Sequence, residues 1–254
     1  MVSKRSNSGQ VLIVVALVIT MLLLSTALYI TDAQKSQLKY TSESDLYLPF
    51  YKQGLRHTMI SALVNISSGG DNSVLESNLN LFNAITLEQS YNAFFTPSFI
   101  LSNTSPYVNG VWTTQNSSGT AIISAYASFG VNSSGTSKTY FSEYDIEVTS
   151  KLEVTGEYQQ IETEKQVQLT CKLSNEEQPA LAKSFTFSYA NDGSLQSENW
   201  TVIEEPNIFD HGNGTYTVTF TAITDQTDDP VLVWVSCQDQ RGIMLQTLVE
   251  PTLS

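Results

Sequence analysis

The two cysteines are the residues whose positions most clearly suggest chemistry. Cys171 and Cys237 each fall within an alternating pattern of apolar residues that predicts a half-buried strand. In an oxidising compartment, cysteines on two facing strands form a disulfide, and closing a loop of this length stabilises a fold by roughly 4 kcal/mol in the chain-entropy treatment. The alternative is two buried free thiols, which behave as small apolar side chains. We expect the disulfide between Cys171 and Cys237.

Other residues that support catalysis or metal binding are few. The two histidines, His57 and His211, have no ligand-like spacing to each other or to the cysteines. Asp225, Asp228 and Asp229 cluster in a loop whose oxygens suit weak calcium binding, although a solvated loop is the preferred explanation. Motifs of the G-x-S-x-G, phosphate-loop, H-E-x-x-H and C-x-x-C types are absent from the sequence. We therefore expect a protein that is not an enzyme and uses no cofactor or metal.

Six N-x-Ser/Thr sequons mark candidate glycosylation sites. All of them follow the apolar N-terminal stretch, and most fall in segments with loop-like composition. They are Asn65, Asn103, Asn116, Asn132, Asn199 and Asn213. Their placement is typical of a glycoprotein exposed at a cell surface.

The charge balance excludes one large class of partners. The chain has 25 acidic and 12 basic residues, a net charge of −13, and only 15% of its residues are charged. Such a surface repels phosphate backbones, so nucleic-acid binding is not expected. The hydrophobic content of 41% is sufficient for a packed core.

The N-terminal stretch Val11–Ile30 is apolar throughout, with no charge between Arg5 and Asp32. Twenty helical residues span roughly 30 Å, the thickness of a bilayer's hydrocarbon core. Lys4 and Arg5 precede the stretch, so the positive-inside rule places the N-terminus in the cytoplasm and the bulk of the chain outside. A retained membrane anchor is the leading interpretation, and a cleaved signal peptide is the alternative.

The residues before this stretch resemble the class III signal of archaeal type IV pilin-like proteins. The resemblance rests on Lys4 to Gln10, which read KRSNSGQ and precede the apolar run directly. It implies cleavage between Gly9 and Gln10, a helix retained as anchor and assembly surface, and an archaeal source. Many pilins carry Glu at the fifth mature position, where this chain has Val14. A plain anchor therefore stands beside the pilin interpretation.

The middle of the chain predicts helices followed by strands. Apolar residues at four-residue spacing, Leu55, Met59 and Leu63, predict a helix that ends near residues 67–70. A capping box over residues 73–76 begins a second helix. Residues 92–120 are rich in turn formers and predict loops. Period-two alternation over residues 120–131 and 140–154 then predicts antiparallel strands, the second with a charged outer face.

The C-terminal region shows the clearest strand pattern. Short alternating segments recur between turn signals from residue 167 to residue 249, which indicates a β-sandwich. The run from Asp210 to Val218, DHGNGTYTV, is similar to the strand entry of many prokaryotic Ig-like surface domains. The Trp that antibody-type domains carry on the third strand is absent, so the resemblance implies the Ig-like architecture only.

Together these features predict an α+β fold with a long N-terminal transmembrane helix. The expected organisation is a cytoplasmic tip and anchor over residues 1–32, a pilin-like helix and antiparallel-sheet region over 33–155, and an Ig-like all-β sandwich over 156–254. The expected function is that of a membrane-anchored cell-surface protein, pilin-like or an adhesion or structural subunit of the cell envelope. Its partners would be membrane lipid through Val11–Ile30, copies of itself and other surface proteins. The alternatives are a tethered ligand-binding module and, further off, a secreted hydrolase with a β-sandwich accessory domain.

Overall fold

The computed structural model describes residues 48–89, 94–115, 118–134, 139–162, 164–192, 194, 200–225 and 230–254, together with Thr20. The chain divides into two compact units, Met1–Gly54 and Leu55–Ser254. Of the first unit, Thr20 and residues 48–54 are described, and all of them are helical. Every strand of the described part belongs to the second unit.

Two helices contribute to the second unit. The first is described over residues 48–67 and enters this unit at Leu55. Leu55, Met59 and Leu63 are fully buried, which confirms the apolar face predicted from their spacing. The second helix, α2, spans Ser73–Gln89.

The start of α2 is capped by an aspartate. Oδ1 of Asp71 accepts a hydrogen bond from the backbone N of Ser73 at 2.8 Å, which satisfies one of the unpaired donors of the first helical turn. Hydrogen bonds from the Ser73 side chain and then from its backbone N lower the pKa of Asp71, because a bonded carboxylate is favoured in its charged form. The cap therefore lies two residues before the predicted capping box.

A nine-stranded sheet forms the larger layer of the fold. Its main path runs in the order β1-β3-β4-β5-β10-β9, while β2 pairs with β3, β6 with β5, and β13 with β4. The strands are β1 (Phe94–Leu101), β2 (Val111–Gln115), β3 (Thr120–Ser134), β4 (Thr139–Ile161), β5 (Glu164–Asn175), β6 (Gln178–Pro179), β9 (Asn207–Asp210), β10 (Thr215–Ile223) and β13 (Thr252–Leu253). All pairs are antiparallel except that of β13 with β4.

A four-stranded sheet forms the second layer over part of the first. Its order is β12-β11-β7-β8, all antiparallel. The strands are β7 (Ala182–Ala190), β8 (Trp200–Val202), β11 (Leu232–Asp239) and β12 (Met244–Val249). The two sheets make a β-sandwich, and the predicted strands and the hairpin after Asp239 are confirmed.

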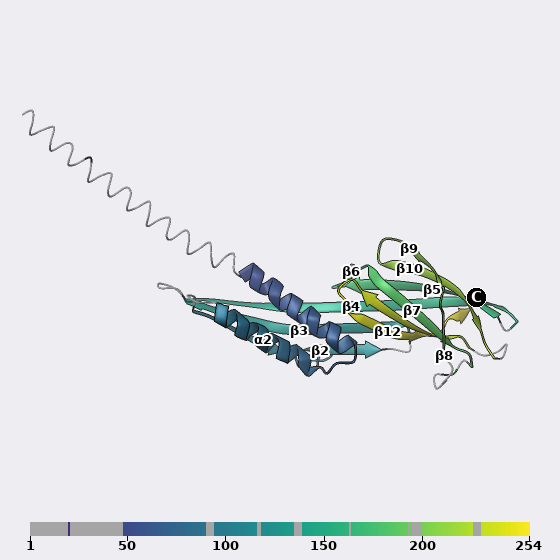
Figure 1. The fold of residues 1–254 in the computed structure, drawn as a ribbon, viewed down its shortest axis with the longest axis horizontal. Coiled ribbons are helices and arrows are strands. Elements are labelled where there is room, and N and C mark those ends of the chain that lie inside the picture. The colour runs from purple at the N-terminus through teal and green to yellow at the C-terminus, as the bar shows by residue number, and fades with distance from the viewer. Residues whose placement is uncertain are drawn as a thin grey trace, which may run out of the picture. The chain divides into compact units, whose positions relative to one another are not determined.

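The helices and the four-stranded sheet cover the same face of the nine-stranded sheet, the helices toward one end of the long strands and the small sheet toward the other (Figure 1). Strand β4 has 23 residues and pairs with β3 over its first part and with β5 over its last part. Its alternate side chains Ile146, Val148, Leu152 and Val154 are buried, as the sequence predicts. The buried face of β4 therefore runs beneath both covering layers, with one buried polar residue, Ser150, between Val148 and Leu152.

The expected fold class is corrected by the structure. The described residues form mostly strands, with two short helices, so the α+β prediction with a long N-terminal transmembrane helix is wrong. The helix predictions were right locally, but within the segment predicted to be loop, Phe94–Leu101 and Val111–Gln115 form the strands β1 and β2. Pro97 is tolerated in β1 because this strand pairs on one side only, so its missing donor costs no sheet hydrogen bond.

The predicted localisation is also corrected. Among the residues that the structure describes, no helix is long and apolar enough to cross a membrane. This finding contradicts the predicted single-pass anchor with an extracellular bulk. The stretch Val11–Ile30 lies outside the described residues except for Thr20, as do Gly9 and Gln10. The predicted domain boundary at 155/156 falls inside β4.

Candidate interaction surface

The uncovered face of the nine-stranded sheet carries the most distinctive group of exposed side chains. On β4, Glu143, Asp145 and Glu147 alternate with inward residues and are exposed. Successive outward residues of a strand lie roughly 7 Å apart, so the three carboxylates form a row. No ion pair found within the described residues involves any of the three. Within the described residues, the row is therefore not neutralised by a neighbouring basic side chain.

Apolar side chains flank this acidic row. Ile100 of β1 is 74% exposed and Phe141 of β4 is 58% exposed. The strand register places both on the same face as the carboxylates, since Ile100 lies opposite Ser128 and Ser128 lies opposite Asp145. The ring of Phe141 lies against Gly130, whose missing side chain leaves room for it. Exposed apolar groups beside unpaired charges are typical of a surface that another molecule covers.

A tyrosine from the segment between β1 and β2 contacts the carboxylate at one end of the row. The hydroxyl of Tyr107 donates to Glu147 Oε1 at 2.7 Å and lies 3.0 Å from Ser124 Oγ. Its ring contacts Trp112 edge-on and Tyr126 at a tilt, with centroid distances of 6.2 and 5.6 Å. Partial burial, followed by the effect of Glu147, raises the pKa of Tyr107, so the phenol stays protonated and remains a donor.

The carboxylates also form hydrogen bonds with side chains of the neighbouring strand β3. Ser128 Oγ donates to Asp145 Oδ1 at 2.7 Å. A hydrogen bond to Asp145 raises the pKa of Tyr126. We define the outer face patch as Ile100, Tyr126, Phe141, Glu143, Asp145 and Glu147. This patch combines fixed negative charge with apolar and phenolic surface, a combination suited to a partner that carries basic side chains.

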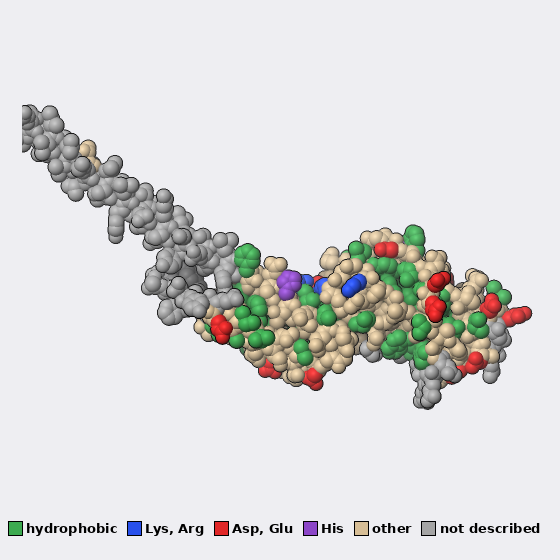
Figure 2. All heavy atoms as spheres, in the orientation of Figure 1, with side chains coloured by type: hydrophobic (Ala, Val, Ile, Leu, Met, Phe, Trp, Pro, Cys, Tyr) green, Lys and Arg blue, Asp and Glu red, His purple; other side chains and the backbone are tan. Residues whose placement is uncertain are grey.

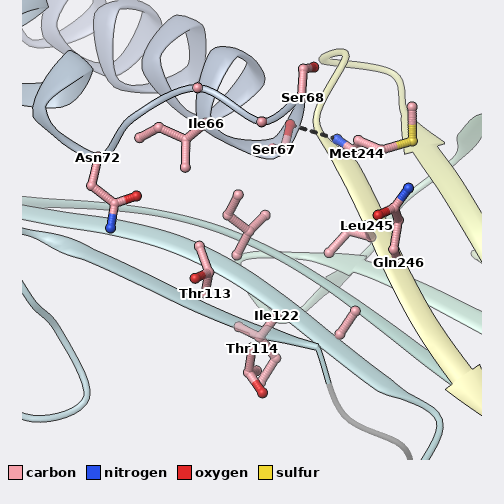
Figure 3. Close-up of a pocket in the computed structure, with 14 residues that line it drawn as sticks. Ile66, Ser67, Ser68, Asn72, Thr113, Thr114, Ile122, Met244, Leu245 and Gln246 are labelled. Atoms are coloured by element: carbon pink, nitrogen blue, oxygen red, sulfur yellow. Dashed lines mark hydrogen bonds between the residues drawn. The ribbon is translucent and has the colours of Figure 1, made fainter. Parts of the chain in front are cut away.

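A hollow lies on the opposite side, where the first helix ends near the four-stranded sheet (Figure 3). It encloses about 540 Å³ and is bounded by the helix end at Ile66–Gly70, by β2 and β3, and by the start of β12 at Met244–Gln246. Ser67 Oγ accepts a hydrogen bond from the backbone N of Met244 at 3.0 Å across its rim. The residues that line it contribute hydroxyl, amide and aliphatic groups, and none has a titratable side chain. The lining of this hollow therefore offers polar and aliphatic groups but no acid or base.

Cys171 on β5 and Cys237 on β11 face the core from opposite sheets, fully buried. Both are free thiols in the structure, so their disulfide stays a prediction. Burial raises the pKa of Cys171 to about 12. Burial also raises the pKa of Cys237, and the nearby Cys171 adds to the shift, which indicates that the two sulfurs share one region of the core. Neither thiol has the low pKa of a nucleophilic cysteine.

The predicted glycosylation sites have different environments, and their use stays a prediction. Asn65 lies near the end of the first helix, and Asn132 lies on β3 on the same face as the outer face patch. Asn103 Oδ1 accepts from the backbone N of Asn109, and Asn213 Oδ1 accepts from the backbone N of Thr215 in the turn before β10. Asn116 and Asn199 lie outside the described residues.

The structure does not bring the histidines and the aspartate cluster into one site. His57 is exposed on the first helix, while Nε2 of His211, in the turn before β10, lies 2.9 Å from Thr217 Oγ1. Asp225 is described, whereas Asp228 and Asp229 are not. Within the described residues, no three His, Cys, Asp or Glu side chains are grouped closely enough to hold a metal ion.

Sequence reasoning identified the acidic row on β4 but not the patch around it. Ile100, Tyr107 and Trp112 belong to the segment that was predicted to be loop. The signals for a strand in this segment were the adjacent apolar residues Phe99 and Ile100 and the aromatic residues near Gly110. No protein-family model matches the sequence, and no curated protein is significantly similar to it.

Proposed function

We propose that this chain is a non-enzymatic structural or adhesion subunit of the cell envelope, which works by protein contacts made through the outer face patch. The observation that carries the proposal is the row of three exposed carboxylates without ion-pair partners, flanked by exposed Ile100 and Phe141. An isolated surface of this kind is unfavourable by self-repulsion and by exposed apolar area, and a basic partner relieves both.

The strand order of the sandwich supports an Ig-like architecture. Its two sheets run β4-β5-β10-β9 and β12-β11-β7-β8. Ig-type sandwiches place their first, second, fifth and fourth strands in one sheet and the remaining strands in the other, and the order here corresponds to that arrangement. Cys171 and Cys237 occupy the second strand and the strand before the last, where Ig domains carry their inter-sheet pair. Such sandwiches are common in surface and adhesion proteins.

The other half of the unit supports the pilin-like interpretation. Two helices pack on one face of an antiparallel sheet, and none of the described elements covers its other face (Figure 1). This remains a likeness of architecture, and architecture alone does not assign function. The charge distribution adds an argument for self-association, because six of the 12 basic residues lie within the first 56 positions, whereas the rest of the chain is strongly acidic.

Basic groups are also visible on the helix-covered face. Figure 2 shows blue side chains gathered near the middle of that face, with red acidic groups toward its ends. Basic groups among the side chains of one face and an acidic row on the other are compatible with a head-to-tail contact, which builds open chains of subunits unless a rotation closes them into a ring. Charge complementarity of this kind chiefly sets register and association rate.

The second candidate is a ligand-binding module, which the hollow at the helix end favours. Its hydroxyl and amide lining suits an uncharged polar group. A hydrolase is disfavoured, since the lining residues supply no general acid or base.

The full chain, analysed by sedimentation velocity over a range of salt concentrations, tests the proposal. We expect association that weakens as salt rises. The double variant Glu143→Lys/Asp145→Lys should weaken association at least about tenfold, because close unlike-charge contacts are worth about 1.5 kcal/mol or more and the change makes them repulsive. The matched control Glu157→Lys/Glu164→Lys makes the same charge change at exposed positions of the sandwich and should associate normally.

Three outcomes distinguish the candidates. A wild-type chain that stays monomeric at high concentration contradicts the structural-subunit proposal and leaves the ligand-binding module. Association that both double variants weaken equally points to net charge rather than to the outer face patch. Weaker association in the Glu143→Lys/Asp145→Lys variant alone supports the outer face patch as the contact surface.

A further inference from the structure

Arg241, in the turn between β11 and β12, joins three parts of the fold through one guanidinium group. Its Nε donates to Asp239 Oδ2 at 2.9 Å, and its Nη1 donates to Glu176 Oε1 at 2.7 Å. Its Nη2 donates to the backbone oxygen of Thr149 at 2.9 Å and to Ser150 Oγ at 2.8 Å. The planar fork of donors therefore fixes β4, the β5–β6 turn and the β11–β12 turn relative to one another.

Asp239 is the buried end of this network. Its Oδ1 accepts from the backbone N atoms of Arg241 and Ile243, both at 2.9 Å, so the carboxylate shapes the turn as well as pairing with the guanidinium. Ser150 Oγ lies 2.8 Å from Asp239 Oδ2. A buried carboxylate without these partners would be strongly destabilising, so this end of the network is held firmly.

Glu176 is the middle of the network and sits in a strained turn. Glu176 and Glu177 have φ values of 45° and 63°, in the left-handed region that residues with a side chain rarely adopt. Such a conformation persists only where the surroundings impose it. Here Glu176 Oε1 accepts from the backbone N of Thr149 at 3.1 Å, and the backbone N of Glu176 donates to the Thr149 oxygen at 3.2 Å.

The other oxygen of Glu176 reaches the first helix. Arg56 Nη2 lies 2.9 Å from Glu176 Oε2, so one carboxylate links an arginine of the helix to an arginine of the sandwich. The same helix meets the hairpin further along, where Val64 lies beside Gly242 and Ser67 bonds to Met244. Side-chain exposure rises steadily along the chain of ion pairs, from 0% at Asp239 through 16% at Arg241 and 29% at Glu176 to 44% at Arg56.

We propose that Glu176 is a latch that holds the first helix against the sandwich at Arg56 and that releases on the helix side first. The buried pair of Asp239 and Arg241 is strong, whereas the solvent-screened pair of Glu176 and Arg56 contributes little and breaks most readily. The end of this helix is held separately, where Ser67 bonds to Met244 at the rim of the hollow (Figure 3). Release of the latch frees the helix at Arg56 while the sandwich stays folded. This inference is independent of the proposed function.

Hydrogen–deuterium exchange of the full chain, followed by mass spectrometry, tests the latch. Arg56→Met removes the helix side alone and should speed exchange of residues 55–70 by about two- to fivefold, the range that an exposed ion pair supports. Glu176→Gln removes both ion pairs of this carboxylate and should have a larger effect on residues 55–70. In Arg56→Met we expect exchange in β7, β10 and β11 to match the wild type, whereas Glu176→Gln also removes a partner of Arg241 and so affects the sandwich as well. Arg56→Lys keeps the charge and should recover most of the protection.

The matched control is Glu153→Gln, which breaks the exposed pair of Lys151 with Glu153 elsewhere on β4. It should leave residues 55–70 unchanged. A parallel increase across the helix and the sandwich strands in Arg56→Met would show a uniform loss of stability and would overturn the latch. Unchanged exchange of residues 55–70 in both Arg56→Met and Glu176→Gln would overturn it as well.

Discussion

At the scale of single residues, burial decides what the two cysteines can do. Cys171 and Cys237 lie in the core of the sandwich, and the pKa of Cys171 is raised from 9.0 to about 12. A thiol reacts as its thiolate, so a pKa that is raised by burial lowers the reactive fraction at any pH below it.

We therefore expect both thiols of the reduced native protein to react slowly with iodoacetamide at pH 8. A shift from 9.0 to about 12 corresponds to about a thousandfold loss of thiolate, and restricted access adds to it. Unfolding in urea should make both residues react at the rate of an ordinary thiol. Labelling rates from mass spectrometry give the measurement, and rapid modification of the folded protein would contradict the buried placement.

At the scale of elements, Gly119 joins three strands. Its backbone N donates to the Leu248 oxygen at 3.0 Å, and its own oxygen accepts from the backbone N of Val154 at 2.7 Å. It has a φ of +78°, and a Cβ placed there would lie 2.1 Å from the Val154 oxygen. Only glycine satisfies both the dihedral angle and the close approach of β4.

We expect Gly119→Ala to destabilise the fold by at least about 1–2 kcal/mol, the cost of the left-handed conformation alone, with more from the displaced backbone of β4. Urea unfolding followed by circular dichroism measures the change. Gly212→Ala is the matched control for the dihedral term, because Gly212 has a φ of +73° but open space around it. Equal losses in both variants would contradict the close contact with Val154.

Individual elements could be predicted from the sequence where one face is buried and the other is exposed to solvent. Alternation along β4 correctly assigned Ile146 and Val148 to the core and Asp145 to solvent. The same approach failed for β1, because Pro97 and the neighbouring turn formers signal a loop unless the strand is known to lie at an edge. Edge position is a property of the whole sheet and has no local signal.

At the scale of the whole molecule, the pairing of elements could not be predicted from sequence patterns. Arg241 contacts Glu176 and Thr149, which lie far from it in the sequence. The local sequence pattern around these residues does not indicate that they are in contact. The outer face patch has the same origin, since the register of three strands brings Ile100 beside Asp145. Sequence patterns predicted a sandwich after residue 156, but not that the sandwich begins within a strand shared with the preceding region.

Because β4 is shared by the two halves of the unit, we can predict where the chain can be cut into fragments that fold. β4 pairs with β5 from Ser150 to Ile161, so a cut at 155/156 removes half of that ladder. The cut also removes Thr149 and Ser150, and Asp239 and Arg241 lose their bonds to β4. Breaking a buried network of charged groups typically costs about 3–5 kcal/mol, a large part of the stability of a domain this small.

We therefore expect the fragment 156–254 to be unfolded or several kcal/mol less stable than the fragment 146–254, which keeps the β4–β5 ladder and the partners of Arg241. Urea unfolding and the dispersion of amide signals in nuclear magnetic resonance spectra give the comparison. The ten added residues bury Val148 and Leu152 against the sandwich core as well as restoring the hydrogen bonds. Equal stability of the two fragments would mean that β4 before Gly156 belongs to the helix-covered sheet alone, whereas the expected difference makes this one strand the structural link between the two halves.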